Sequence, residues 1–505
     1  MEEGYNDRLR YSTEVSSLNF LTDPKFKHDE QCGFPTASKS TPTGATTAEA
    51  SGFSDTCSSD GETCESVLSS ASPSHKEHVM SPNLDELVTH DVGTSVFDLS
   101  DFGSVPQFIN YRIENKLESG SFLVTNLASV VRQYNQWRDE LPMVEPFYAV
   151  KCNPDPCILR LMASLGLNFD CATMGEIDLV LHGLGEELSF PVSKAARSIV
   201  YANPAKMQHM IEYAVHHGVR MTVFDGEDEL EKIATTVGHE HLQLLLRLTT
   251  DDKASVCQFS KKFGCPVDDA PNLLAVAKRL NLNVAGVSFH VGSGCGDADA
   301  YVTALAHAKR VFDAAEALGM PALHIVDLGG GFPGDTGGYG GPGMPTFQDI
   351  ARAIRKGIDS FLAGYPHAKE SLRFIAEPGR YFVSASTTIV TKVYSRKGGQ
   401  NKYQALYVDD GVYGSFNNVV YDHANPVPQK LSSVLQPKDE ELLPSAVFGP
   451  TCDGLDQMCK QDSTTLPRCE VGDWLIWENQ GAYTHTASFV FNGYTHVPTK
   501  CYCYL

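Results

Sequence analysis

Three polar residues with well-defined chemical abilities lie at the ends of short apolar runs. Lys151 ends the run PFYAVK, His290 lies near the end of NVAGVSFHV, and Glu377 lies near the end of SLRFIAEP. A lysine amine that is partly shielded from water has a lowered pKa and can form an imine with a carbonyl compound. A single lysine at the end of a strand is usually only solvated, so the residues that accompany Lys151 decide its interpretation.

A further set of residues is typical of a phosphate-binding site. The glycines Gly329, Gly330 and Gly331 let backbone N–H groups approach an anion, Ser293 adds a hydroxyl, and Arg380 supplies a planar, charged donor. Glycine-rich turns are common, so the three glycines carry weight only together with Ser293 and Arg380.

A phosphate site and an imine-forming lysine together indicate pyridoxal 5′-phosphate (PLP). The pyridine nitrogen of this cofactor needs an acidic partner that keeps it protonated, and Glu377 is a candidate for this role. His290 carries a flat ring that is able to stack on the cofactor, although many such histidines only satisfy core hydrogen bonds. Asp170 in LNFDCA and Arg247 in LQLLLRL are further polar residues near the ends of apolar runs.

These residues require a scaffold that brings the ends of many strands together. Eight nearly continuous apolar runs alternate with amphipathic stretches, as expected for parallel strands buried on both faces. The runs are 146–151, 167–172, 198–203, 221–225, 242–248, 283–291, 322–330 and 371–378, and clear amphipathic stretches are 206–216 and 301–318. This alternation predicts an α/β fold, a (β/α)₈ barrel over 127–386 with its reactive groups at the carboxyl ends of the strands.

The two ends of the chain lack the alternation of apolar runs and amphipathic stretches that is typical of the barrel. β-branched and aromatic runs predict a C-terminal β-sandwich or β-barrel-like domain over 387–505. These runs are VSASTTIVTKVYS, QALYVDDG, EVGDWLIWEN and ASFVFNGY. A strand within about 94–110 is expected to join this domain, so that 93–126 forms an N-terminal strand segment. Residues 35–74 contain 18 Ser or Thr in 40 positions, and we expect 1–92 to be a disordered, acidic leader.

The overall composition excludes several classes of protein. The net charge is −22, from 62 acidic and 40 basic residues, which disfavours nucleic acid and anionic membranes as partners. The start MEEGYNDRLR lacks the apolar run of a signal peptide, and no run of 18 apolar residues predicts a transmembrane helix. The 14 cysteines show neither the paired spacing of a metal site nor the density of a disulfide scaffold. We therefore expect a cytoplasmic protein without a bound metal.

Ten motifs occur in an order that resembles the eukaryotic ornithine decarboxylases, a family of fold-type III, alanine-racemase-like PLP enzymes. The motifs are PFYAVKCN, FDCAT, YANPAK, FHVGSGC, DLGGGFPG, AEPGRYFV, YGSFN, YDHA, GPTCDGLD and GAYT. The similarity extends from about residue 94 to near the C-terminus. It implies PLP-dependent decarboxylation of L-ornithine to putrescine and CO₂, the first step of polyamine biosynthesis.

The resemblance also implies roles for individual residues. Lys151 is similar to the imine-forming lysine of the family, Glu377 to the partner of the pyridine nitrogen, and His290 to the stacking ring. Residues similar to the phosphate-binding set or to other cofactor contacts are Asp170, Glu176, Arg247, Ser293, Gly329, Gly330, Gly331, Gly379, Arg380 and Tyr483.

Four residues resemble the substrate-binding part of the family's site. Tyr421 and Asp422 resemble substrate contacts, Cys452 resembles the catalytic proton donor, and Asp453 resembles its neighbour that holds the distal amine. In the family, Cys452 and Asp453 reach the site from the other subunit, which implies a homodimer with two shared active sites. Carboxylates suit a cationic δ-ammonium and contribute about 1.5–3 kcal/mol per charge-assisted contact.

Two other interpretations remain open. Decarboxylases for lysine, arginine or diaminopimelate share the scaffold, and the diaminopimelate enzymes usually show Glu-Ser after the donor cysteine, where Asp453-Gly454 stands here. The second is a catalytically inactive binding protein similar to antizyme inhibitor, a class that loses PLP-binding residues. Regulation by antizyme is an open question, because 206–240 holds only Lys206, Arg220 and Lys232 against seven acidic residues, few for docking an acidic partner.

Overall fold

The computed structural model describes residues 96–504, except 185–191, 239–241, 335–342, 366–371, 399–401 and 495–497. All of these residues fall within one unit of the chain, His78–Leu505. The leader expected over 1–92 lies outside the described residues. In the part that is described, no helix is long and apolar enough to cross a membrane.

Eight parallel strands close into a barrel, as the alternation of apolar runs predicts. Their order around the barrel is β11-β12-β3-β4-β5-β6-β7-β9. Closure occurs where β12 pairs with β3, with Phe374 opposite Val144. The strands are β3 (Val144–Ala149), β4 (Asn168–Cys171), β5 (Ile199–Tyr201), β6 (Met221–Phe224), β7 (Gln243–Arg247), β9 (Val284–Ser288), β11 (Ile325–Asp327) and β12 (Arg373–Ala376). Each of the eight predicted runs overlaps one of these strands, so the barrel is confirmed.

Side chains from inside the strands fill the barrel. One buried apolar cluster takes at least one residue from seven of the eight strands, and its members are Phe147, Val200, Met221, Val223, Leu245, Ala285, Ile325 and Ile375. The strand interiors are therefore occupied by packing, so polar groups gather at the strand ends.

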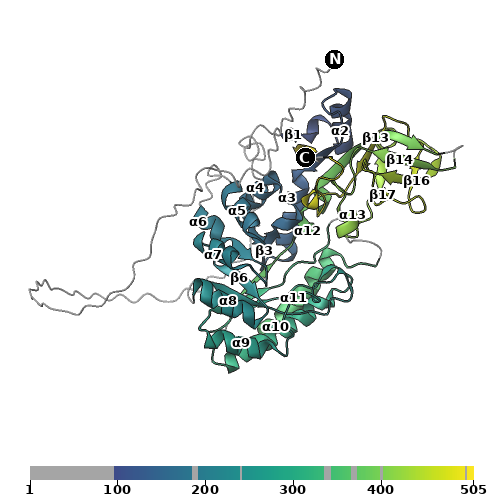
Figure 1. Ribbon diagram of the computed structural model, residues 1–505. Helices are drawn as coiled ribbons and strands as arrows, with labels where there is room; N and C mark the ends of the chain where they lie inside the picture. The colour runs from purple at the N-terminus through teal and green to yellow at the C-terminus, as the bar shows by residue number, and fades with distance from the viewer. Residues whose placement is uncertain are drawn as a thin grey trace, which may run out of the picture. The chain divides into compact units, whose positions relative to one another are not determined.

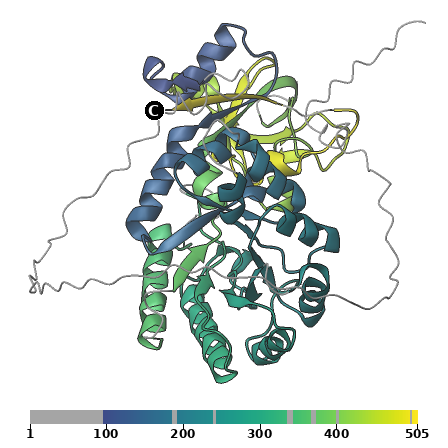
Figure 2. The same ribbon diagram turned by 90° about the vertical axis from the view of Figure 1, so that its left-hand side faces the viewer.

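Amphipathic helices cover the outside of the barrel (Figures 1 and 2). They are α3 (Leu127–Glu140), α4 (Pro156–Ser164), α5 (Met174–Gly183), α6 (Val192–Arg197), α7 (Gln208–His216), α8 (Glu227–Val237), α9 (Ala270–Arg279), α10 (Asp299–Ala317) and α11 (Phe347–Ala363). The helical patterns at 206–216 and 301–318 form α7 and α10. Helix α11 begins with a capping box, in which Thr346 and Asp349 each accept a backbone N–H of the other.

A second, ten-stranded sheet contains strands from both ends of the described chain. Its longest strand, β13 (Thr387–Lys397), pairs with β2 (Phe122–Asn126), β14 (Gln404–Val408) and β19 (Trp474–Trp477). The other strands are β1 (Val96–Asp98), β15 (Pro428–Lys430), β16 (Leu442–Phe448), β17 (Gln457–Cys459), β18 (Thr465–Pro467) and β20 (Thr499–Tyr504). This strand-rich region confirms the predicted C-terminal β architecture. Two further strands, β8 (Ser255–Cys257) and β10 (Ser293–Cys295), form a ribbon beside the barrel.

The predicted strand at ASFVFNGY is wrong. The segment contains the end of a short 3₁₀ helix, His485–Ala487, and one isolated bridge between Phe491 and Tyr494. Asn492 and Gly493 both have positive φ angles, 50° and 78°, which interrupt extended backbone. The apolar character of the segment has another use, because Phe489 and Phe491 pack against the ring of Tyr413.

The predicted strand within 94–110 is shorter than expected. Among the described residues of this range, only Val96–Asp98 form a strand; a 3₁₀ helix, Leu99–Asp101, follows, and the helix α2 (Val105–Glu114) begins at Val105. Ser104 caps this helix and Pro106 lies in its first turn, two start signals that outweigh the β-branched residues nearby. Strand β2, near the end of the predicted segment 93–126, was not expected as a separate strand; it pairs with both β13 and β20.

Candidate active site

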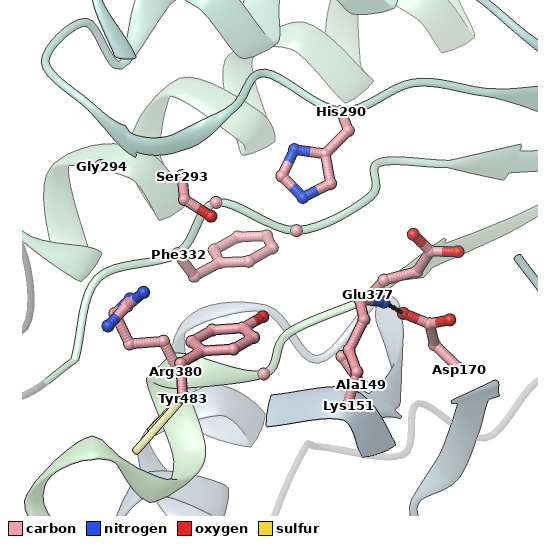
Figure 3. Close-up of a pocket in the computed structure, with 13 residues that line it drawn as sticks. Ala149, Lys151, Asp170, His290, Ser293, Gly294, Phe332, Glu377, Arg380 and Tyr483 are labelled. Atoms are coloured by element: carbon pink, nitrogen blue, oxygen red, sulfur yellow. Dashed lines mark hydrogen bonds and ion pairs between the residues drawn. The ribbon is translucent and has the colours of Figure 1, made fainter. Parts of the chain in front are cut away.

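A pocket at the carboxyl ends of the barrel strands gathers most of the predicted cofactor residues (Figure 3). The space between its side chains, together with the open solvent at its mouth, amounts to about 380 Å³. Its walls are formed by Ala149, Lys151, Asp170, His290, Ser293, Gly294, Gly330, Gly331, Phe332, Glu377, Gly379, Arg380 and Tyr483. Ten of these thirteen residues are among those singled out from the sequence.

Lys151 forms an ion pair with Asp170 inside the pocket. Lys151 follows β3 in a short 3₁₀ turn, and Asp170 lies in β4 with a completely buried side chain. Burial by itself lowers the pKa of Lys151, but Asp170, Tyr483 and Glu377 together raise it above its usual value. The lowered pKa expected for this amine is therefore wrong, because a buried carboxylate lies within contact of the nitrogen.

Glu377 follows β12 and is 5% exposed. Burial raises the pKa of Glu377 well above its usual value, and the nearby carboxylates of Asp327 and Asp170 raise it further. Its Oε1 atom is buried and has no hydrogen-bond partner among the described residues. The Glu377 side chain lines the pocket, so its carboxyl group is able to accept a nitrogen-bound proton there.

His290 is an uncharged ring in the opposite wall of the pocket. Burial, followed by the positive charges of Arg247 and Lys151, holds the pKa of His290 well below its usual value. Its Nδ1 atom accepts a hydrogen bond from the Gly292 N–H at 3.0 Å, which fixes the plane of the ring. A neutral, fixed ring is suited to stacking against an aromatic cofactor.

The glycine run forms a turn whose backbone has no room for side chains. Gly329 and Gly331 have φ angles of 61° and 101°. A Cβ on Gly330 would lie 2.8 Å from His290 Nε2, and one on Gly331 would lie 2.5 Å from the Gly292 carbonyl oxygen. Only glycine allows this turn to approach a ligand so closely. Together with Ser293, the turn forms the cradle that an anion such as phosphate requires.

Arg380 and Tyr483 form the wall next to the glycine run (Figure 3). The Arg380 guanidinium lies 5.0 Å from the centre of the Tyr483 ring. Tyr483 comes from the C-terminal part of the chain, and its N–H donates to the Cys152 carbonyl at 2.9 Å. Arg380 also donates to both carboxylate oxygens of Asp422, at 2.8 and 2.7 Å, so Asp422 contacts a phosphate-site residue.

The remaining predicted cofactor residues lie just behind the pocket wall. Arg247 is the last residue of β7, is 6% exposed, and acts electrostatically on His290 and Glu377. Glu176, in the first turn of α5, accepts the Ala172 N–H at 2.6 Å, and burial raises its pKa. Gly329 accepts the Glu377 N–H at 2.7 Å.

None of the four predicted substrate residues lines this pocket in the single chain. Tyr421 is 62% exposed, and Cys452 lies exposed in the turn after β16. Asp453 is hydrogen-bonded to the hydroxyl of Tyr413, which holds its pKa below the usual value. Asp422 is held by Arg380 beside a second, more open pocket that also contains His423, Asn425 and Glu478.

Four residues of the site were missed in the sequence. Ala149, Gly294 and Phe332 line the pocket next to residues that were identified. Asp327 ends β11, is completely buried, and hydrogen-bonds the Gly329 N–H through Oδ1 at 2.9 Å. Asp327 lies at the end of an apolar run, two residues before the glycine run. The rule that polar residues at the ends of barrel strands are functional would therefore have identified it.

Comparison with known proteins agrees with this geometry. Residues 127–384 match the family model of the pyridoxal-dependent decarboxylases, pyridoxal-binding domain. Mouse (Mus musculus) ornithine decarboxylase is 39% identical over 430 residues, which cover 81% of this chain and 86% of that protein. The chain belongs to the eukaryotic ornithine decarboxylase family of pyridoxal-dependent decarboxylases.

Two further relatives show the breadth of this family. Antizyme inhibitor 2 from Xenopus laevis is 39% identical over 422 residues, which cover 80% of this chain and 86% of that protein. The crystal structure of an arginine decarboxylase from Paramecium bursaria Chlorella virus, bound to agmatine, is 31% identical, with a TM-score of 0.69. That match covers 79% of this chain and 100% of the viral protein.

The residues in the pocket fit the cofactor of the family, PLP. The Lys151 amine for an aldehyde, the Glu377 carboxyl group for a ring nitrogen, and a glycine cradle with Arg380 for a phosphate all face one cavity. Among the described residues, no group of His, Cys, Asp and Glu is arranged to hold a metal ion.

Proposed function

We propose that this chain catalyses the PLP-dependent decarboxylation of L-ornithine to putrescine and CO₂. The observation that supports it most directly is the meeting of Lys151, Glu377 and the glycine cradle in one pocket (Figure 3). Each of the three matches a different part of PLP: the aldehyde, the ring nitrogen and the phosphate.

The residues of the pocket would divide the work of catalysis. Lys151 would hold the cofactor covalently, Glu377 would keep the pyridine nitrogen protonated, and Ser293 and Arg380 would bind the phosphate. Bound PLP supplies an electron-accepting ring that stabilises the charge left on Cα when CO₂ departs. The buried carboxylate of Asp170 stabilises a positive charge on the nitrogen of Lys151 throughout.

The substrate end of the site requires groups from outside the pocket. Asp422 and Asp453 are acidic and suit the δ-ammonium of ornithine, and Cys452 is an exposed thiol able to return a proton to Cα. Because Cys452 and Asp453 do not line the pocket of their own chain, we propose that they complete the site of a second copy in a homodimer.

Replacing Cys452 by alanine should keep PLP bound while slowing putrescine formation. Without a donor aimed at Cα, part of the protonation is expected at the cofactor carbon, which releases an aldehyde instead of putrescine. Product analysis by chromatography, with the buried Cys459→Ala variant as a control for loss of a thiol, measures the ratio. A variant that makes only putrescine at the parent rate would assign the proton to another donor.

The main alternative is a decarboxylase for a neighbouring amino acid. Lysine is one methylene longer than ornithine, a difference that binding discriminates by only about 1–3 kcal/mol. Some turnover of lysine is therefore expected.

Purified protein supplied with ornithine, lysine and arginine in parallel should release CO₂ fastest from ornithine, and only when PLP is present. On this scale of discrimination we expect ornithine to exceed lysine in kcat/KM by roughly tenfold or more. Faster CO₂ release from lysine or arginine would show that the chain is a lysine or arginine decarboxylase instead. No CO₂ from any of the three substrates would favour a binding protein.

The second alternative is a catalytically inactive protein similar to antizyme inhibitor. Retention of Lys151, Glu377 and Arg380 in one pocket favours the enzyme, because a protein that does not bind PLP has no need for them. A visible absorbance of bound PLP that borohydride bleaches separates the two classes before any assay of turnover.

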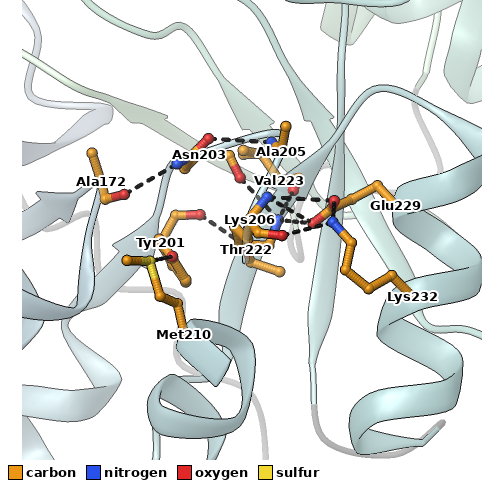
Figure 4. Close-up of polar contacts among 10 residues, drawn as sticks. All are labelled: Ala172, Tyr201, Asn203, Ala205, Lys206, Met210, Thr222, Val223, Glu229 and Lys232. Atoms are coloured by element: carbon orange, nitrogen blue, oxygen red, sulfur yellow. Dashed lines mark hydrogen bonds and ion pairs between the residues drawn. The ribbon is translucent and has the colours of Figure 1, made fainter. Parts of the chain in front are cut away.

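The segment considered for antizyme docking uses its positive charges internally (Figure 4). The side chain of Lys206 is completely buried, and its Nζ donates to the carbonyl of Val223 at 2.7 Å and pairs with Glu229 at 2.9 Å. Lys232 pairs with the same Glu229 and donates to the Lys206 carbonyl. Two of the three cations in 206–240 therefore hold the loop after β5, strand β6 and helix α8 together, and their charges are used inside the fold and not offered to an acidic partner.

A further inference from the structure

Asp327 and Glu377 are brought together by two neighbouring strands of the barrel. Asp327 is the last residue of β11, Glu377 directly follows β12, and the two strands pair in parallel. The Glu377 N–H donates to the Gly329 carbonyl at 2.7 Å, which continues the pairing beyond the strand ends. Asp327 is 0% exposed and Glu377 is 5% exposed, so water does not solvate this pair.

Each of the two carboxyl groups leaves one buried oxygen without a partner. Oδ1 of Asp327 accepts the Gly329 N–H, whereas Asp327 Oδ2 and Glu377 Oε1 have no hydrogen-bond partner among the described residues. Two ionised carboxylates cannot bond to each other because neither has a proton to donate. A single proton makes one of them a donor and the other an acceptor, and it satisfies both oxygens at once.

The charges around the pair also leave room for one proton. Three carboxyl groups, those of Asp170, Asp327 and Glu377, face two cations, Lys151 and Arg247, while the His290 ring is uncharged. With every carboxyl group ionised, the cluster would bury one uncompensated negative charge. Burial raises the pKa of Asp327 to about 7, although the Gly329 N–H, Glu377 and Arg247 act in the opposite direction.

We propose that Asp327 is a positioning residue of the cofactor site, which shares one proton with Glu377 and thereby orients the Glu377 carboxylate toward the pyridine nitrogen. This inference rests on the proposed role of Glu377. Before PLP binds, the shared proton neutralises the buried cluster, and the remaining oxygen of Glu377 stays available as an acceptor for the protonated ring nitrogen. Asp327 itself does not touch the cofactor in this arrangement.

The first test is the pH dependence of stability in the Asp327→Asn variant. The amide introduced there would accept the Gly329 N–H through its oxygen and donate to Glu377 through its nitrogen, without a titrating proton. A carboxyl group with a raised pKa stabilises the fold fully below its unfolded pKa, near 3.8, and this contribution is lost as the pH rises to about 7. We therefore expect the melting temperature of the PLP-loaded variant to rise relative to that of the parent by a few degrees between about pH 4 and 7. Above about pH 7 the difference between the two melting temperatures should stay constant.

A melting-temperature difference that is independent of pH would overturn the shared proton, because a merely structural aspartate gives parallel profiles. If Asp327→Asn does not yield folded protein, the same pH profiles are measured with Glu377→Gln. This variant removes the other of the two carboxyl groups that would share the proton, so it tests the same proposal. Asp313→Asn, on the exposed face of α10, is the matched control and should show parallel profiles.

The second test is the affinity for PLP, measured by fluorescence quenching without substrate. Asp327→Ala leaves Glu377 without its partner and should weaken PLP binding by about tenfold to a hundredfold, whereas Asp327→Asn should restore it to near the parent value. Equal affinities for the alanine variant and the parent would overturn the positioning role. Glu377→Gln tests the proposed role of Glu377 separately: unchanged PLP affinity there would refute that role, while the pH profiles still decide the shared proton.

Discussion

Replacing Lys151 by alanine is expected to reduce turnover by at least about a thousandfold, the largest single effect that we predict. Among the residues described in the pocket wall, Lys151 is the one whose amine is placed to attach PLP covalently, and this amine is able to carry a proton during the exchange of the imine. Both covalent catalysis and proton transfer are lost with it. The measurement is CO₂ release from ornithine, together with the visible absorbance of bound PLP before and after borohydride.

The control for this variant must account for Asp170, whose side chain is completely buried. Removing Lys151 leaves that carboxylate without its cation, at a cost of at most about 3–5 kcal/mol, because the Lys151 side chain is 42% exposed to the pocket. Lys151→Arg keeps the charge but cannot form an imine, so we expect it to be folded and equally inactive. Lys253→Ala removes an exposed amine, 87% accessible, and should leave activity unchanged. Near-normal turnover in Lys151→Ala would refute the proposed attachment site.

The barrel could be predicted from the sequence because its strands are buried on both faces. Runs such as 242–248 are then almost continuously apolar and stand out from the helical stretches between them. The same rule that locates reactive groups at strand ends identified Lys151, Asp170 and Glu377, which the structure brings together in one pocket. The apolar runs were sufficient to predict these features because a strand that is buried on both faces needs apolar residues at nearly every position.

The strand-rich region was predicted less accurately because its pairing is not local. Strand β2 pairs with β13 and β20, which lie more than 250 residues further along the chain, and no local pattern reports such partners. At ASFVFNGY, aromatic residues suggested a strand but serve to pack against Tyr413. Helix α2 could have been recognised from Ser104 and Pro106, had capping been weighed against the β-branched residues.

The electrostatics of the site could not be read from residue types. Lys151 was expected to have a lowered pKa, but the direction depends on the carboxylate of Asp170, nineteen residues away, and on Glu377 and Tyr483. The contact between Arg380 and Asp422 is another such case, because it connects a predicted phosphate residue to a predicted substrate residue. Such effects depend on distances across the barrel mouth, which spacing in the sequence does not encode.

Mixing two impaired variants is expected to restore about a quarter of the parent rate of putrescine formation. Lys151 lines the pocket, whereas Cys452 lies exposed after β16 and does not line the pocket of its own chain. If the active site is shared between subunits, Lys151→Ala and Cys452→Ala each still carry the group that the other lacks. In a mixed dimer, one site then inherits both defects and the other inherits none.

The expected recovery follows from the symmetry of a two-fold dimer. Random reassortment at equal concentrations makes about half of the dimers mixed, and each mixed dimer has one intact site of two. The experiment mixes the two variants under conditions that allow subunit exchange, verifies exchange with differently tagged subunits, and then measures putrescine formation from ornithine. Mixing Lys151→Ala with Lys151→Arg is the matched control, and it should recover nothing because both defects lie in the same half of the site. If exchange is demonstrated and activity does not recover, both residues serve the site of one chain, and the proposal that Cys452 and Asp453 complete a partner's site is wrong.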